Sequence, residues 1–240
     1  GRRHHEQSYT QSGVSHGLAM LATLSVLTLV LPNFTTSEGG AFYNSTQLAF
    51  VAVISLIVYA TFVAAQTIRH RDHFLNPAED AHAHVAPVAR ATAIAAGGML
   101  LTALVAVVLL AKSLSPTIEA GVAAIGAPQA LVGIIIAGLV LAPEGFAAVR
   151  AARLNRVQTS LNLAIGSALA TIGLTIPAVA ITALVMGLDL ELGLSMRSTV
   201  LLALTLMVAT LTLGTGRTTV VQGVIHLVIF VTFLFITLVP

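Results

Sequence analysis

Residues 130–145 read ALVGIIIAGLVLAPEG, and residues 158–177 read QTSLNLAIGSALATIGLTIP. The first of these is an apolar run with the character of a membrane span, and it ends on a carboxylate, Glu144. A charged side chain at membrane depth costs roughly 2.5–3.5 kcal/mol on insertion scales. Glu144 is therefore a candidate functional residue. The alternative is a carboxylate that only holds two helices together.

The residues beside Glu144 weaken the backbone around it. Pro143 removes a backbone donor and tends to kink a helix, and Gly145 lets another backbone approach closely. Interrupted helices at membrane depth are tolerated where they line a cavity, and in transporters they mark ion sites. We therefore expect Glu144 to lie on a locally opened helix.

The composition indicates an integral membrane protein. Of the 240 residues, 57% are hydrophobic and 8% are charged, against about 25% charged in soluble domains. A formal net charge of +2 without a basic stripe argues against a nucleic-acid partner. The chain has no Cys, which excludes disulfides, thiolate metal sites and a cysteine nucleophile.

Apolar stretches near the length needed to cross a bilayer predict about seven transmembrane helices and an all-α polytopic membrane protein. No alternating pattern indicates a β-barrel. The expected spans are Val14–Leu31, Thr46–Ile68, Val88–Ala111, Ala130–Val149, Leu161–Met186, Ser198–Leu213 and Val220–Val239.

The charge of the loops sets the orientation, because Lys and Arg concentrate on the cytoplasmic side of short loops. With a cytoplasmic N-terminal end, all 11 basic residues except Lys112 and Arg197 fall inside. We therefore expect the N-terminal end of this chain to be cytoplasmic. The opening Gly1 in place of Met leads us to expect residues upstream.

The spans suggest four parts of the chain. These are 1–111, with three helices and an inside polar loop at 70–87; 112–129, a short outside connecting segment; 130–187, a helix pair; and 188–240, with the last two helices. Pro116 and Pro128 are expected to bracket a separate short helix in the second part. His82 and His84 in the inside loop have the spacing of a metal pair, with a merely solvated loop as the alternative.

The helix that begins near Gln158 carries polar and small side chains on one side. Hydroxyl side chains recur at intervals of seven and four residues, which places them on one side of a helix. An amide and two glycines form a neighbouring stripe. The set is Ser160, Ser167, Thr171, Thr175, Asn162, Gly166 and Gly173. Such oxygens suit hard cations such as Ca²⁺ and Na⁺, whereas ordinary helix packing also explains the glycines.

Two further polar residues are expected to support the site. Glu119 is placed to gather cations at the outer surface, unless it only complements a helix N-terminus. His226 has the titration range of a proton shuttle, with an interhelical hydrogen bond as the alternative. Thr171 is the third supporting residue.

The stretch from Leu141 to Pro177 resembles the second α-repeat of the bacterial ChaA-type calcium (sodium, potassium)/proton antiporters, members of the cation/Ca²⁺ exchanger superfamily. Residues 3–8, 66–71 and 215–220 agree with this resemblance, which runs along nearly the whole chain. In that family, two inverted α-repeats meet in mid-membrane, and an acid from each binds the cation or the protons that exchange for it. The resemblance implies that Glu144 is this acid and that Asn162 and Ser167 are polar site positions.

The chain also departs from the family. It has Leu-Ala-Pro before the acid where many relatives have Gly-Asn, and no acid lies within an apolar run before Lys112. The resemblance therefore implies that a first α-repeat is missing and that the fold is a partial inverted-repeat exchanger. A missing N-terminal half, or a second copy of the chain, is expected to complete the site.

The resemblance implies a secondary antiporter of the bacterial inner membrane that exchanges Ca²⁺, or Na⁺ or K⁺, for protons, with Glu144 as the metal-binding residue and no cofactor. Two other classes stay open. An intramembrane enzyme with Glu144 as base and His226 as partner needs a nucleophile or a His-Glu-x-x-His run, which the sequence lacks. A structural membrane subunit needs only an interhelical hydrogen bond from Glu144.

Overall fold

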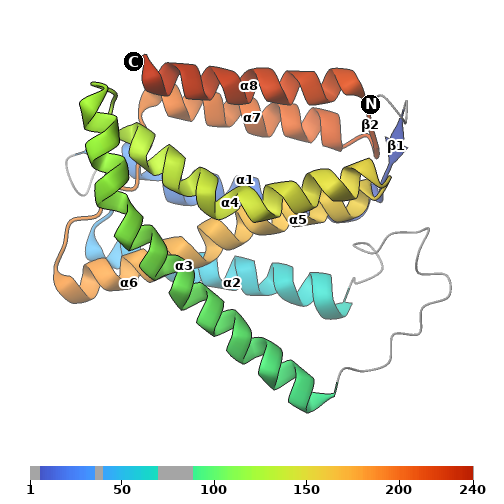
Figure 1. Ribbon diagram of the computed structural model, residues 1–240, viewed down its shortest axis with the longest axis horizontal. Helices are drawn as coiled ribbons and strands as arrows, with labels where there is room; N and C mark the ends of the chain where they lie inside the picture. Colours follow the sequence, from blue (N-terminus) through green and yellow to red (C-terminus); the bar gives the residue numbers. More distant parts are fainter. Residues whose placement is uncertain (1–5, 36–39, 70–88, 240) are drawn as a thin grey trace.

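The computed structural model describes residues 6–35, 40–69 and 89–239 (Figure 1). π-Helical segments at Val26–Val30, Ala65–Arg69 and Thr171–Thr175 extend or join the α-helices, and a 3₁₀ turn covers Leu31–Phe34. The α-helices are α1 (Gln11–Ser25), α2 (Ser45–Ala64), α3 (Arg90–Ala124), α4 (Ala130–Arg153), α5 (Val157–Ala170), α6 (Ile176–Met186), α7 (Met196–Leu213) and α8 (Val220–Leu238). The strands are β1 (Gln7–Ser8) and β2 (Arg217–Thr218).

The described residues contain seven helical stretches long and apolar enough to span a membrane, as the sequence predicts. The first runs through the π and 3₁₀ segments as Gln11–Phe34, and the fifth joins α5, Thr171–Thr175 and α6 as Val157–Met186. The protein is thus an all-α polytopic membrane protein. The expected short sixth span begins two residues earlier, at Met196, because the Ser195 side chain caps it by accepting a hydrogen bond from the Ser198 N–H.

The connection after the third span differs from expectation. The residues from Lys112 onward were expected to form a separate outside segment, but α3 continues through Pro116 to Ala124, and only residues 125–129 connect it to α4. Pro116 removes one backbone donor, whereas ending the helix there would leave several backbone groups without partners. At membrane depth that difference favours the continuous helix.

The core lies between α1, α2, α5, α6 and α7. Leu24 of α1 and Leu169 of α5 are completely buried in one apolar cluster. Leu48 of α2 and Ala180 of α6 belong to a second cluster, which lies between those two helices. The α5–α6 span is therefore held by packed helices along its length.

The outer helices α3, α4 and α8 expose much of their apolar surface, and α3 crosses α4 obliquely (Figure 1). Met99 of α3 is 74% exposed and Phe146 of α4 is 76% exposed. Large apolar side chains on the outside of spanning helices suit contact with lipid or with further membrane segments.

The two strands join distant parts of the chain. β1 pairs antiparallel with β2, with Gln7 opposite Thr218 and Ser8 opposite Arg217. The exposed Glu6 carboxylate lies 3.5 Å from the Arg217 guanidinium. The β1–β2 strand pair lies at the end of the molecule where α4 turns into α5 (Figure 1).

Candidate functional site

Glu144 lies in the second half of α4 and meets α5. The two helices form an antiparallel hairpin, and the Ser167 hydroxyl of α5 donates a hydrogen bond to Oε2 of Glu144. The connecting turn places Asn155 in the left-handed region, with φ of 63°, a conformation that Asn adopts more readily than most residues. Local sequence thus folds a carboxylate and a hydroxyl that lie 23 positions apart against each other.

The change of helix type near the site lies in the α5–α6 span and not in α4. α4 is helical from Ala130 to Arg153, with Pro143 inside it, so the expected local opening at Glu144 is wrong. The neighbouring span instead changes to a π-helix at Thr171–Thr175, one turn after Ser167. Single π-helical turns within α-helices occur frequently at functional sites. Pro143 removes one backbone donor from α4, and a proline inside a helix commonly bends it.

Two glycines, Gly166 and Gly173, lie near this π-helical segment and differ in their packing. A Cβ added to Gly173 would lie 2.7 Å from Cβ of Tyr59 on α2, so α2 approaches the backbone closely at this point. A Cβ added to Gly166 would meet nothing within 4 Å. Only Gly173 of these two glycines is required by a close helix contact in the described residues.

The other expected residues lie at different distances from Glu144. Thr171 donates its hydroxyl to the Ser167 backbone carbonyl at 2.9 Å, one turn along the same helix. Asn162 accepts a hydrogen bond from Nε2 of Gln158 at 3.0 Å, on the part of α5 toward the α4–α5 turn. The structure therefore brings Ser167 directly to Glu144 and places Asn162 beside Gln158.

Glu119 and His226 have partners elsewhere. Glu119, near the end of α3, accepts a hydrogen bond from the Ser115 hydroxyl of its own helix at 2.9 Å. Nε2 of His226, on α8, lies 2.9 Å from the hydroxyl oxygen of Thr212, on α7. That hydroxyl lies 2.7 Å from the Val208 carbonyl, which can only accept, so Nε2 of His226 is the donor to Thr212. His226 thus joins α7 to α8.

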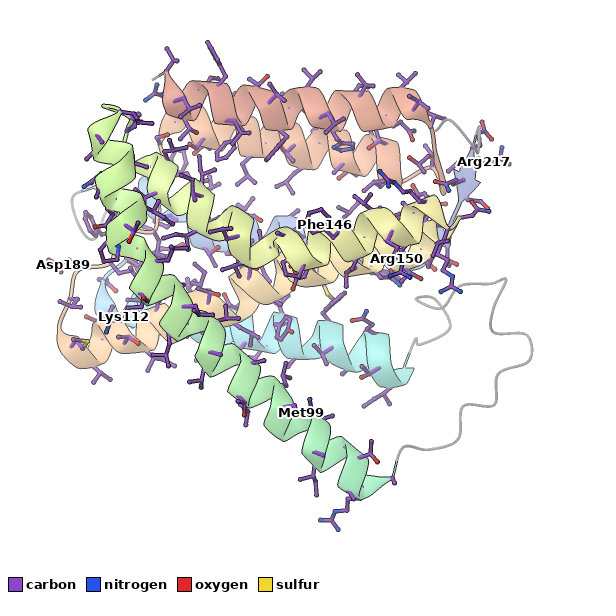
Figure 2. All side chains as sticks on the ribbon, in the orientation of Figure 1. Met99, Lys112, Phe146, Arg150, Asp189 and Arg217 are labelled. Atoms are coloured by element: carbon purple, nitrogen blue, oxygen red, sulfur yellow. The ribbon has the colours of Figure 1, made fainter. Side chains whose placement is uncertain are left out.

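The exposure of the site leaves the Glu144 carboxylate accessible. Glu144 is exposed and Ser167 is partly buried. Figure 2 shows that mostly carbon side chains surround the middle of α4, near Phe146. The described residues contain no group of three or more His, Cys, Asp or Glu that could hold a metal ion. A carboxylate and a hydroxyl are hard ligands. Ca²⁺ takes six to eight oxygens, so Glu144 and Ser167 alone supply too few to complete its coordination.

An apolar cavity of about 540 Å³ lies next to the site, between α3 and α4. Pro143, which precedes Glu144, lines it together with Leu110, Leu114, Ile136 and Leu139. Its lining offers hydrocarbon and a few hydroxyls, which do not replace the hydration shell of a cation. It extends the apolar surroundings of the carboxylate. The expected His82 and His84 pair lies outside the described residues.

The sequence did not single out the residue that ties the start of α5 to the rest of the chain. Gln158 is 2% exposed, accepts a hydrogen bond from the Thr10 N–H at 2.7 Å, and donates to Asn162. Its partner Thr10 lies 148 positions away. The only available signal was an amide at the start of an otherwise apolar helix.

Comparison with known proteins gives one family and two relatives. The family model for "Sodium/calcium exchanger protein" matches residues 95–239. The "Putative ionic transporter y4hA" of Sinorhizobium fredii is 48% identical over 240 residues, which are 100% of this chain and 65% of that protein. The "Sodium-potassium/proton antiporter ChaA" of Escherichia coli is 31% identical over 238 residues, 98% of this chain and 64% of that protein. The chain thus spans about two thirds of the length of these relatives.

Proposed function

The chain belongs to the sodium/calcium exchanger protein family, and from this membership we propose that it is part of a secondary antiporter that exchanges cations for protons across a bacterial inner membrane. The resemblance to cation exchangers is confirmed by this family and by the ChaA relative. The observation that carries the proposal is the pairing of Glu144 with the Ser167 hydroxyl inside the region that matches the family.

Glu144 couples the two fluxes in this proposal. A bound cation favours the ionised carboxylate, and a proton removes its charge, so the two compete for the same oxygens. The Ser167 hydroxyl donates to the carboxylate when the cation is absent. When a cation is bound, the hydroxyl rotates and offers its lone pairs as a ligand. Alternating access then carries either the cation or protons past the same group.

The transported cation is Ca²⁺, Na⁺ or K⁺ in this proposal. A carboxylate, a hydroxyl and the Asn162 amide are oxygen ligands that suit all three, because each is a hard cation. The E. coli relative is named for sodium, potassium and protons. Competition among the three cations in one flux assay ranks their apparent affinities for the protein.

Two oxygens from Glu144, one from Ser167 and one from Asn162 are about four ligands, fewer than the six to eight that Ca²⁺ takes. We assign the missing ligands to an N-terminal half of the full-length protein, which brings a second acid to the exposed side of Glu144. A second copy of the chain, paired by symmetric contacts, is the other way to complete it.

The orientation follows the loop charges. Figure 2 shows Arg150 and Arg217 at one end of the molecule and Lys112 and Asp189 toward the other. The first end then faces the cytoplasm, together with the N-terminal strand, because short cytoplasmic loops are enriched in Arg and Lys.

The Ser167–Glu144 hydrogen bond also suits a structural subunit, so that function is the second candidate. An intramembrane enzyme is disfavoured because His226, its expected partner, donates to Thr212 of α7. The family consists of exchangers, which fits transport better than catalysis.

Proton flux in everted vesicles separates transport from a structural role. Vesicles with the full-length protein are energised until a pH-sensitive dye is quenched, and Ca²⁺, Na⁺ or K⁺ is then added. We expect the cation to relieve the quenching, and Glu144→Gln to abolish this response while membrane insertion is unchanged. Glu191→Gln, the same change at an exposed acid in the loop before α7, serves as the control. Normal flux with Glu144→Gln would overturn the proposal.

A further inference from the structure

The second half of α4 carries exposed apolar and basic side chains on one face. By helical geometry, Phe146, Val149, Arg150 and Arg153 lie within an arc of about 100° around the helix. All four are exposed, Phe146 to 76% and Val149 to 51%. Arg150 and Arg153 lie in the last turn of α4. We call these four residues the α4 strip.

The α4 strip faces away from α5. Glu144, which accepts the hydrogen bond from Ser167 of α5, lies about 160° around α4 from Phe146. Ala148 and Ala151, on the same side of α4 as Glu144, are partly buried. The strip is therefore turned toward the surroundings of the helix bundle and not toward the carboxylate of the candidate site.

The apolar and basic parts of the strip lie at different depths. Phe146 is four residues before Arg150, and Val149 is four residues before Arg153, which corresponds to about 6 Å along the helix axis. The headgroup layer on each side of a bilayer is roughly 5–7 Å thick. Figure 2 shows Arg150 closer than Phe146 to the end of α4 that turns into α5. One lipid can therefore contact the apolar side chains with an acyl chain and the guanidinium groups with its headgroup.

The charge around the strip is complementary to an anionic headgroup. Residues 145–188 contain three arginines, Arg150, Arg153 and Arg156, all exposed, and no Asp or Glu. Glu6, beside strand β1 at the same end of the molecule, lies 3.5 Å from Arg217. Within the described residues, no hydrogen bond or ion pair engages the side chains of Arg150 and Arg153. Their guanidinium donors can therefore bind phosphate oxygens.

Two simpler roles explain only part of the α4 strip. Basic residues in a last turn complement the negative end of a helix, and arginines are enriched in short cytoplasmic loops. Neither role requires exposed Phe and Val side chains on the same face one turn earlier. The planar guanidinium of arginine also matches phosphate geometry more closely than the ammonium of lysine does. The combination of apolar and basic side chains favours a phospholipid as the partner.

We propose that the α4 strip is a binding site for an anionic phospholipid, whose phosphate is held by Arg150 and Arg153 and whose acyl chain packs on Phe146 and Val149. The inference goes beyond the proposed function and does not depend on it. The bound lipid contacts α4 on the face opposite to the one that carries Glu144.

A fluorescent reporter in the strip tests the proposal in the full-length protein. The described chain has no Trp, so Phe146→Trp adds a signal that is measured as the difference from the protein without this change. The protein is reconstituted in mixtures of phosphatidylcholine and phosphatidylglycerol, in which one lipid at a time carries brominated acyl chains that quench Trp on contact. Each arginine near a membrane surface contributes about a 5-fold preference for anionic lipid. We therefore expect phosphatidylglycerol to be preferred at the strip by roughly 5- to 25-fold.

Equal quenching by the two lipids would overturn the proposal. Quenching by neither lipid would also overturn it, because another part of the full-length protein would then cover the strip.

Charge variants test the role of the two arginines. In the reporter protein, Arg150→Gln combined with Arg153→Gln should remove most of the preference, while both lipids still quench. Lysine at both positions keeps the charges, so Arg150→Lys combined with Arg153→Lys should retain a smaller preference. Arg197→Gln, the same change at an exposed arginine at the start of α7, is the control and should keep the full preference. An unchanged preference in the double Gln variant would contradict the assignment to these arginines.

A second reporter tests whether the preference belongs to the strip. Phe235→Trp makes the same change at a phenylalanine of α8 that is 62% exposed and lies near the end of that helix. It should show nearly equal quenching by the two lipids. The same preference at both reporters would mean that the protein attracts anionic lipid in general and has no site at the strip.

Inorganic phosphate distinguishes a lipid headgroup from a free anion. We expect the preference at the Phe146→Trp reporter to persist when phosphate replaces chloride at constant ionic strength. Its loss in phosphate would show that the arginines bind the free anion, and would overturn the assignment of a lipid.

Discussion

Two helix pairs in this protein are joined by similar chemistry and differ in what it leaves accessible. Between α4 and α5, the Ser167 hydroxyl donates to an exposed carboxylate, Glu144. Between α7 and α8, the hydroxyl of Thr212, a residue 9% exposed, accepts a hydrogen bond from His226 and donates one to the Val208 carbonyl of its own helix. In the second contact the Thr212 hydroxyl is buried and has both a donor and an acceptor partner, and so we interpret the contact as packing. The first leaves carboxylate oxygens accessible, and so can bind a ligand.

The largest effect is expected from shortening the exposed side chain. Glu144→Asp keeps the charge but moves the carboxylate away from the Ser167 hydroxyl. Losing a hydrogen bond to a charged group corresponds to about 1.5–3 kcal/mol, or roughly 10- to 100-fold in apparent cation affinity. Cation-dependent dye recovery in everted vesicles measures it. Wild-type affinity in Glu144→Asp would mean that the geometry between the two side chains is unimportant.

A second effect concerns the packed side of the span that carries Ser167. Gly173→Ala places a Cβ at 2.7 Å from Tyr59 of α2, and we expect overpacking to destabilise the protein by about 1–3 kcal/mol. Thermal unfolding in detergent measures this loss. Gly166→Ala, where a Cβ meets nothing within 4 Å, is the matched control and should unfold near the wild-type temperature. Equal losses in both variants would show that the π-helical segment is not held by α2.

Removing the hydroxyl alone should have a smaller effect than shortening the acid. In Ser167→Ala, water can take the place of the lost donor beside Glu144, which is exposed. We expect the cation concentration for half-maximal flux to rise about 3- to 10-fold. Thr212→Val removes the corresponding hydroxyl of the α7–α8 pair, and its affinity should match that of the wild type. A shift of the same size in both variants would remove the distinction between the two helix pairs.

The smallest effect is expected at the shielded contact. His226→Leu removes the donor to Thr212, and interhelical hydrogen bonds in membranes contribute about 0.6 kcal/mol on average. Thermal unfolding in detergent should show a correspondingly small destabilisation, and proton flux should be unchanged. Loss of flux with intact stability would assign His226 to the proton path.

The fold was largely predictable because membrane spans depend on local composition. Seven apolar stretches predicted seven spans, and Ser195 moved one end by two residues. The exceptions involve proline. Pro116 and Pro143 both lie inside continuous helices, because a span keeps its remaining backbone hydrogen bonds where no water can replace them. Composition does not show which prolines lie inside a continuous membrane helix and which end one.

The site was predictable in part for the same reason. Glu144 could be identified because a carboxylate in an apolar run costs free energy at membrane depth. The resemblance indicated Ser167, whose hydroxyl donates to Glu144 in the structure. Gln158 did not stand out, because the partners described above are a backbone N–H from the start of the chain and a side chain one turn away. The β1–β2 strand pair has two residues on each side, too few for a periodic pattern.

The competition between cation and proton at Glu144 can be measured directly by chemical labelling. A hydrophobic carbodiimide reacts with protonated carboxyl groups in apolar surroundings, and mass spectrometry of the full-length protein in membranes quantifies the labelled Glu144. The proposal predicts that the transported cation protects Glu144, and that the concentration for half-protection rises as the pH falls, because protons compete for the same oxygens. Labelling of Glu144 that none of Ca²⁺, Na⁺ and K⁺ reduces at any pH would contradict it.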